Sequence, residues 1–260
     1  MPTEITLLEK VYGRYSLNAL DNALTPMIEG LDAHLKFVGK TNRGWIKAEV
    51  SGEDETVALN QLREKMGFAP ESITNIRRFL TVRGRVIFSG RKDTEICVDV
   101  GVFSPEVFDA VVPLENLQAQ LADGKKMPLK QLTELFCLYD NTPLRVKIID
   151  CLNGQSRPIL AEISEAQIAQ FTSWIRSSLD RLIVFCAPSS YVRQAIGKSK
   201  LTRDIIAIEE LGVLEHSLVC KLGTDAVGLI PKLGPLLPAA NFASFSPRKI
   251  QKLIRGRFTP

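Results

Sequence analysis

The chain has 260 residues, is 45% hydrophobic and 24% charged, and carries a formal net charge of +4. This composition is ordinary for a soluble globular protein, and the length indicates two or three compact units. No apolar run approaches the ~20 residues that a transmembrane helix needs, and the chain start lacks the basic and then apolar pattern of a secretory signal. We therefore expect neither a membrane protein nor a secreted one.

The first predicted unit, residues 1–79, alternates strand and helix patterns. Strands are expected at residues 5–12, 33–38 and 45–50. Ser16 and Asp54 have the side chains that favour helix N-caps, so a helix is expected after each. The second helix has an apolar stripe made of Val57, Leu59, Leu62 and Met66. The order β-α-β-β-α predicts a ferredoxin-like lobe.

The middle unit, residues 80–164, reads as five short strands separated by Gly, Asn or Pro. The strands are expected at residues 83–88, 96–100, 110–114, 144–149 and 159–163. Their period-two alternation and β-branched residues suit a sheet with one buried face, and five such strands in a short unit fit an OB-type barrel. Residues 115–140 form an insertion with two short amphipathic helices, on which Lys125, Lys126 and Lys130 are expected to face water.

Five stretches of this unit resemble the S-one RNA-binding domain in order and spacing. They are Gly84-Arg85-Val86, Cys97-Val98-Asp99-Val100-Gly101, Ala110-Val111-Val112-Pro113-Leu114, Val146-Lys147-Ile148-Ile149-Asp150 and residues 159–164. The resemblance implies an RNA-binding barrel. At the positions where that family stacks bases, however, this chain has Thr94, Cys97 and Pro113. Phe88, Phe103 and Phe108 are alternative stacking rings, although packing inside the barrel is the plainer role for large aromatic side chains.

The last unit, residues 165–260, repeats the β-α-β-β-α pattern. A helix is expected after Ser164, followed by the strand at 181–187, the helix at 189–196, two strands at 204–209 and 215–222, and a helix that Pro231 interrupts. This unit holds 13 basic and 7 acidic side chains, whereas the other two units each hold 10 basic and 11 acidic ones. The excess is largely in a tail helix that begins at Ser246-Pro247.

Residues 190–238, together with LADGKKMPLKQLTELFCLYDNTPLRV at residues 121–146, resemble an archaeal family described as domain of unknown function 2110. This resemblance extends over nearly the whole chain. It implies an archaeal cytoplasmic protein and supplies no activity. The predicted architecture is therefore α+β, with a central five-stranded OB-type β-barrel between two β-α-β-β-α lobes.

The residues that carry chemistry do not assemble into a catalytic set. Gly197-Lys198-Ser199 ends like a phosphate-binding loop, but Val192 stands where that motif needs its first glycine. The two histidines, His34 and His216, have no neighbouring nucleophile and orienting acid in the sequence. The five cysteines are scattered and odd in number, which favours reduced thiols over disulfides, and no pair has zinc-ligand spacing. We expect no catalytic residues, no cofactor and no metal.

The barrel and the basic tail together predict a non-catalytic RNA-binding protein that works with ribosomal or transcription machinery. Two alternatives stay open: an adaptor whose barrel and tail bind an acidic protein partner, and an enzyme that processes nucleic acid. The candidate RNA contacts are Arg83, Arg85, Phe88, Arg91, Lys92, Lys147, Arg157, Lys198, Lys200, Arg248, Lys249, Lys252, Arg255 and Arg257.

Overall fold

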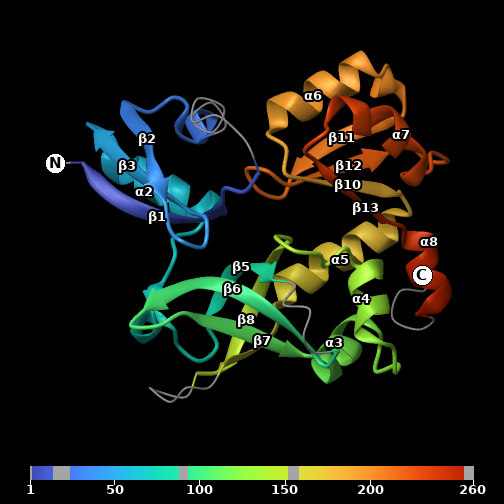
Figure 1. Ribbon diagram of the computed structural model, residues 1–260, viewed down its shortest axis with the longest axis horizontal. Helices are drawn as coiled ribbons and strands as arrows, with labels where there is room; N and C mark the ends of the chain where they lie inside the picture. The colour runs from blue at the N-terminus through green and yellow to red at the C-terminus, as the bar shows by residue number, and fades with distance from the viewer. Residues whose placement is uncertain (1, 14–23, 88–92, 152–157, 255–260) are drawn as a thin grey trace.

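The computed structural model describes residues 2–13, 24–87, 93–151 and 158–254, which form a mixed α+β structure with three sheets. Figure 1 shows the first sheet beside the last one, with the middle unit below both. None of the described helices is long and apolar enough to cross a membrane.

The first sheet is antiparallel with the strand order β1-β3-β2. Its elements are β1 (Thr3–Lys10), β2 (Ala33–Lys40), β3 (Trp45–Gly52) and the helix α2 (Glu55–Lys65). Leu62 of α2 is fully buried, whereas Val57 is 51% exposed and Ala58 faces the core instead. The predicted stripe was thus wrong at Val57, because Ala58, Leu62 and Met66 follow the i, i+4 spacing of one helix face. Of the helix expected after Ser16, residues 14–23 lie outside the described residues.

The middle unit is a closed barrel of five strands, as the alternation of its sequence predicted. The strands are β5 (Thr81–Ile87), β6 (Glu95–Ser104), β7 (Phe108–Pro113), β8 (Pro143–Asp150) and β9 (Ile159–Ile163). Neighbouring strands pair in the cyclic order β5-β6-β7-β9-β8, and only the β7–β9 pairing of this described circuit is parallel. Val98 and Val100 of β6 are fully buried inside, so Asp99 between them points to the outer face.

Two short helices occupy the insertion between β7 and β8, again as predicted. They are α3 (Leu114–Leu121) and α4 (Leu129–Leu135). Leu117 and Leu132 belong to the apolar core that also contains the barrel interior. Phe136, directly after α4, is 1% exposed and extends this core toward the last unit.

The last unit has a four-stranded antiparallel sheet with the order β11-β12-β10-β13. Its elements are α5 (Glu165–Ser177), β10 (Arg181–Phe185), α6 (Ser189–Lys198), β11 (Ile205–Glu210), β12 (His216–Cys220), α7 (Ile230–Leu233), β13 (Asn241–Phe245) and α8 (Pro247–Leu253). The strand β13 was not predicted. Pro231 lies in a run of short helical turns, which agrees with the expected interruption.

Each face of this sheet packs against a different layer. Leu182 and Val184 of β10 pack in one core with Val192 of α6. On the opposite face, Phe245 of β13 contacts Phe136 of the barrel insertion at a centroid distance of 6.3 Å and Trp174 of α5 at 5.2 Å. The barrel and the last unit therefore share one continuous apolar core.

All five cysteines lie in the described residues, and none of them forms a disulfide. Burial raises the pKa of Cys137 to about 12, and burial together with the nearby Asp180 raises the pKa of Cys220 to about 11. These two thiols are thus held in the protonated form, which is a poor nucleophile.

Candidate functional site

Arg83 and Arg85, two of the predicted RNA contacts, point outward from β5, but Arg85 does not reach solvent and Arg83 reaches it only in part. Arg85 has a side chain that is 0% exposed, and that of Arg83 is 15% exposed. The expectation that Arg85 contacts RNA is corrected, because the other two units cover the face of the barrel on which it lies. The outer face of β5 is an interface within the chain.

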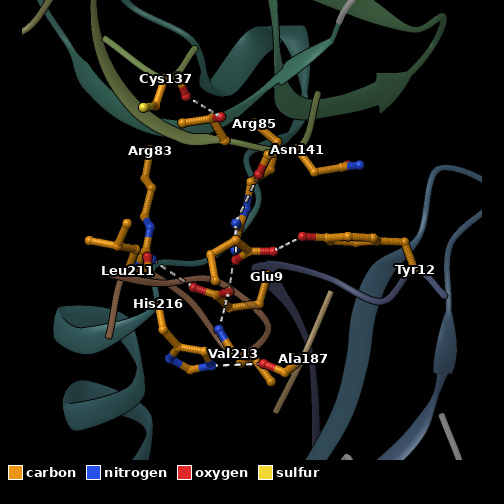
Figure 2. Close-up of polar contacts among 12 residues, drawn as sticks. Glu9, Tyr12, Arg83, Arg85, Cys137, Asn141, Ala187, Leu211, Val213 and His216 are labelled. Carbon is orange, nitrogen blue, oxygen red and sulfur yellow. Dashed lines mark hydrogen bonds and ion pairs between the residues drawn. The ribbon is translucent and has the colours of Figure 1, made fainter. Parts of the chain in front are cut away.

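A buried network of charged groups holds the three units together at this face (Figure 2). The guanidinium of Arg85 pairs with Glu9 of β1 and with Glu215, the residue that precedes β12. Arg83 also pairs with Glu9, at 2.9 Å between Nη2 and Oε1. The Tyr12 hydroxyl donates a hydrogen bond to Glu215, and the backbone N–H of Val213 donates one to Glu9 at 3.0 Å. The two carboxylates and two guanidinium groups balance in charge.

The pKa shifts in this network fix the protonation of its donors. Burial opposes the charge on Arg85, but the carboxylates of Glu215 and Glu9 outweigh it and raise the pKa of Arg85 above its ordinary value. Burial, and then the charge of Glu215, raise the pKa of Tyr12, so its phenol stays neutral and donates. Burial also raises the pKa of Glu215, and the buried Nε of Arg85 has no hydrogen-bond partner among the described residues. The network therefore joins the three units mainly through its ion pairs.

A second charged group joins the first unit to the outer face of β6 and β7. Asp99 accepts from Lys10 at 2.6 Å and pairs with the Nε of Arg43 at 3.1 Å. Asp99 also accepts from the indole N–H of Trp45 at 3.2 Å, and Arg43 reaches Asp109 at 2.6 Å. The first unit thus contacts the outer face of β6 and β7 at Asp99 and Asp109, whereas Thr94, one of the three positions aligned with S-one stacking residues, stays exposed.

A cleft of about 450 Å³ opens beside the Arg83–Glu9 pair, and all three units line it. The first unit contributes Lys65, the barrel contributes Arg145, and the last unit contributes Gln170. Phe136, Phe171 and Trp174, which belong to the shared apolar core, reach its wall. This arrangement combines an apolar wall with a few polar groups, as small-molecule sites do.

Exposed cations gather on a different surface, where the tail helix meets the barrel insertion. Lys249 and Lys252 lie on the solvent side of α8, whose Ile250 is fully buried. The Nζ of Lys125 donates to the carbonyl of Leu253 at 2.7 Å, which places the insertion loop beside the end of α8. We call Lys125, Lys126, Lys249 and Lys252 the basic face. All four are exposed, and none takes part in an ion pair among the described residues.

The remaining predicted RNA contacts have different surroundings. Arg248 borders a small hollow that also contains Asp180 and Asp225. Lys147 lies 3.7 Å from Glu162 and is partly neutralised. Lys198 and Lys200 are exposed at the end of α6, on the far side of the last sheet from α8. The candidates outside the described residues are Phe88, Arg91, Lys92, Arg157, Arg255 and Arg257.

Sequence reasoning missed the acidic partners Glu9 and Glu215 and the grouping of Lys125 with α8. Glu9 and Glu215 lie 76 and 130 positions from Arg85, so no local pattern links them. Similarly, Lys125 and Leu253 are 128 positions apart. The only available signal was the strand alternation. It placed Arg85 on the outside of the barrel but did not show that other units would cover it.

Comparison with known families finds two matches in this chain. Residues 4–72 match the DUF2110 N-terminal domain, and residues 179–244 match the DUF2110 C-terminal domain. No curated protein matches. Among solved structures, one crystal structure from Thermus thermophilus is 13% identical with a TM-score of 0.17, and the match covers 97% of this chain but 42% of that one. The similarity to that structure is too low to relate the two folds.

Proposed function

We propose that this chain, which belongs to the DUF2110 family, is a non-catalytic RNA-binding protein that acts with ribosomal or transcription machinery. The observation that carries the proposal is the basic face. Two segments far apart in the sequence place four exposed lysines together, and the described carboxylates do not pair with them. Positive side chains that gather on a surface without acidic partners are typical of a site that binds a phosphate backbone.

The connectivity of the barrel supports an OB type. Numbered along the chain, its strands pair in the order 1-2-3-5-4 with a parallel contact between the third and fifth, and the helical insertion follows the third. OB barrels commonly bind oligonucleotides. The last unit, with its β-α-β-β-α-β order and the sheet order β11-β12-β10-β13, supports a ferredoxin-like lobe. Neither fold fixes a function by itself.

The proposal moves the RNA site away from the outer face of β5, β6 and β7. That face already contacts the first and last units through Arg85 and Asp99. The basic face lies instead at the insertion end of the barrel, next to the end of the described tail helix. RNA is therefore expected to be held mainly through its phosphates, with little discrimination between sequences.

The test is fluorescence anisotropy with a short, labelled, mixed-sequence single-stranded RNA at low salt. Lys249→Glu with Lys252→Glu is expected to weaken binding about tenfold or more, because two phosphate contacts become repulsive. The matched control is Lys36→Glu with Lys40→Glu, which makes the same charge change at two exposed positions of β2. The control is expected to bind like the unaltered protein.

Two results would overturn the proposal. The first is equal weakening by the two double variants, which would show that net charge alone governs the interaction. The second is binding of poly-glutamate to the basic face as tightly as RNA. That second result would favour the acidic-protein adaptor, and a pull-down that survives nuclease treatment would then identify its partner.

A further inference from the structure

The cleft between the three units has the size and position of a small-molecule site. Its volume of about 450 Å³ falls within the roughly 300–1,000 Å³ that such sites occupy, and junctions between units are a preferred place for them. Residues from all three units line it, so an occupant would touch each unit at once. The basic face has no residue in this lining.

The cationic groups of the lining exceed its free carboxylates. Glu9 is occupied by Arg83 and Arg85, and Glu210 accepts from Ser189 at 3.0 Å and pairs with Arg193 at 3.8 Å. Lys65 donates to the carbonyl of Met27 at 3.2 Å and has no carboxylate partner among the described residues. An anion in the cleft would thus meet positive charge that is not yet neutralised.

Of the cationic side chains that line the cleft, Arg145 makes the fewest hydrogen bonds and ion pairs. It is exposed, and its guanidinium forms no ion pair or hydrogen bond among those seen in the described residues. Arg145 lies opposite Arg83 across β5 and β8, and the pKa of Arg83 is lowered first by burial and then by the charges of Arg85 and Arg145, so the guanidinium groups of Arg83 and Arg145 repel each other. An anion placed between them would relieve that repulsion.

The remaining lining supplies an apolar wall and an amide. Phe136 and Phe171 meet edge to face at 5.3 Å, and Phe171 meets Trp174 at 6.0 Å. The Gln167 side chain is fixed, since its Oε1 accepts from the Arg145 backbone N–H at 3.2 Å and its Nε2 donates to Gln170 at 3.1 Å. That bond uses the oxygen of Gln170 and leaves the amide nitrogen as a donor.

From these contacts we infer that the cleft binds a small organic anion with a flat aromatic ring. Its phosphate or carboxylate lies against Arg145 and Lys65, and its ring lies against the wall of Phe136, Phe171 and Trp174. Arginine suits this role because its planar guanidinium binds both kinds of anion through two parallel hydrogen bonds. The inference does not depend on RNA binding at the basic face.

The experiment is isothermal titration calorimetry with the full chain and two probes, AMP and indole-3-acetate, which share a flat ring and differ in their anionic group. Adenosine lacks the phosphate of AMP, and inorganic phosphate lacks its ring. Each is expected to bind at least about tenfold more weakly than AMP. Because only the folded state forms the cleft, each bound probe is also expected to raise the melting temperature.

Arg145→Gln is expected to weaken probe binding about tenfold to a hundredfold, the usual effect of losing a charge-assisted hydrogen bond. Arg176→Gln is the matched control, because Arg176 is exposed on α5 and does not line the cleft. The double variant Lys249→Glu with Lys252→Glu should bind the probes normally, which separates this test from the RNA test.

Three results would refute the inference. They are the absence of binding by both probes at millimolar concentration, equal binding of AMP and inorganic phosphate, and equal effects of Arg145→Gln and Arg176→Gln. Melting curves without ligand check folding. Arg145 is exposed and makes no described side-chain bond, so Arg145→Gln should melt like the unaltered protein.

Discussion

The guanidinium of Arg85 and the carboxylate of Glu215 form an ion pair in which neither side chain is exposed to solvent. Arg85 belongs to the barrel and Glu215 to the last unit, while Glu9 joins the same guanidinium from the first unit. A buried charge is tolerated only when it is paired and hydrogen-bonded. The stability of the protein therefore depends on the three units keeping the relative positions that bring Arg85, Glu215 and Glu9 together.

Replacing Glu215 with glutamine should destabilise the protein by roughly 3–5 kcal/mol, because Arg85 loses a buried counter-charge that water cannot replace. Urea unfolding measures this change. Glu4→Gln is the control, since the pair of Glu4 with Lys47 has side chains that are 57% and 40% exposed. Such a pair contributes at most about 1 kcal/mol. A Glu215→Gln effect no larger than that of the control would contradict the prediction.

The buried His216 should make stability depend on pH. Its Nε2 is 2.8 Å from the carbonyl of Ala187, so Nε2 carries the proton, and its Nδ1 is buried without a partner among the described residues. Burial lowers the pKa of His216 below its ordinary value of about 6.5. Because the folded state then binds this proton less readily than the unfolded state, stability is present above pH ~6.5 and is lost as the pH falls toward the folded pKa.

Urea unfolding at several pH values below neutrality measures this loss. The slope contributed by one group is at most about 1.4 kcal/mol per pH unit. His216→Gln should remove that share of the slope, whereas His34→Gln, at an exposed position of β2, should leave it. Comparing slopes rather than absolute stabilities keeps the test valid even if His216→Gln is itself destabilising. Parallel pH profiles for His216→Gln and the unaltered protein would refute this assignment.

Phe136 should stabilise the barrel and the last unit together. It is 1% exposed and contacts Phe171 and Phe245. Phe136→Ala is expected to cost roughly 3–5 kcal/mol, the usual effect of emptying a buried aromatic site. Phe79→Ala, at a position that is 61% exposed, should change stability by less than about 0.5 kcal/mol. Two separate unfolding transitions, with only one shifted by Phe136→Ala, would argue against a shared core.

The barrel could be predicted from the sequence because each strand alternates on its own. Val98 and Val100 face inward and Asp99 outward, and this pattern depends only on neighbouring residues. The strand β13 was not predicted because it is only five residues long and follows a Pro-rich segment, so it has too few alternating positions to be recognised. It was recognisable only from its pairing with β10.

The junction could not be predicted, for a different physical reason. Alternation placed Arg83 and Arg85 on the outside of the barrel, where cations usually meet water. The structure keeps that orientation, but the other units cover both side chains, so Arg85 is fully buried and Arg83 is 15% exposed. Their partner Glu9 lies in β1, whose apolar neighbours gave no sign that a carboxylate was needed there. The strand assignment was thus correct, but the outward-facing arginines contact the other units instead of water.

RNA binding should weaken with salt in proportion to the phosphates that the basic face neutralises. For four lysines on a single strand, log K is expected to fall with log salt at a slope of about −3. The double variant Lys249→Glu with Lys252→Glu should reduce the slope to about −1.5 or flatter, because two contacts are lost. Anisotropy titrations at several salt concentrations give both slopes. A flat response of the unaltered protein would rule out phosphate contact at this face.

Gly212 tests how tightly the charged junction is packed. A Cβ built on Gly212 would lie 2.7 Å from Nη2 of Arg85 and 2.9 Å from Oε2 of Glu9, and it would also overlap Glu215. These atoms are buried and bonded to one another, so they cannot yield without breaking ion pairs. Gly212→Ala is therefore expected to destabilise the protein by at least about 1–3 kcal/mol, the usual cost of overpacking.

The matched control is Gly197→Ala in α6, where an added Cβ meets no atom within 4 Å. Gly197 lies in the last turn of α6, where alanine is favoured over glycine by less than the about 0.5–1 kcal/mol of a helix interior, so this variant should be at least as stable as the unaltered protein. Both variants replace a glycine with alanine. Comparing their urea unfolding therefore separates overpacking at the junction from a general effect of losing a glycine. Equal stability of the two variants would mean that Glu9, Arg85 and Glu215 have room to move, and the junction would then not hold the three units in one fixed arrangement.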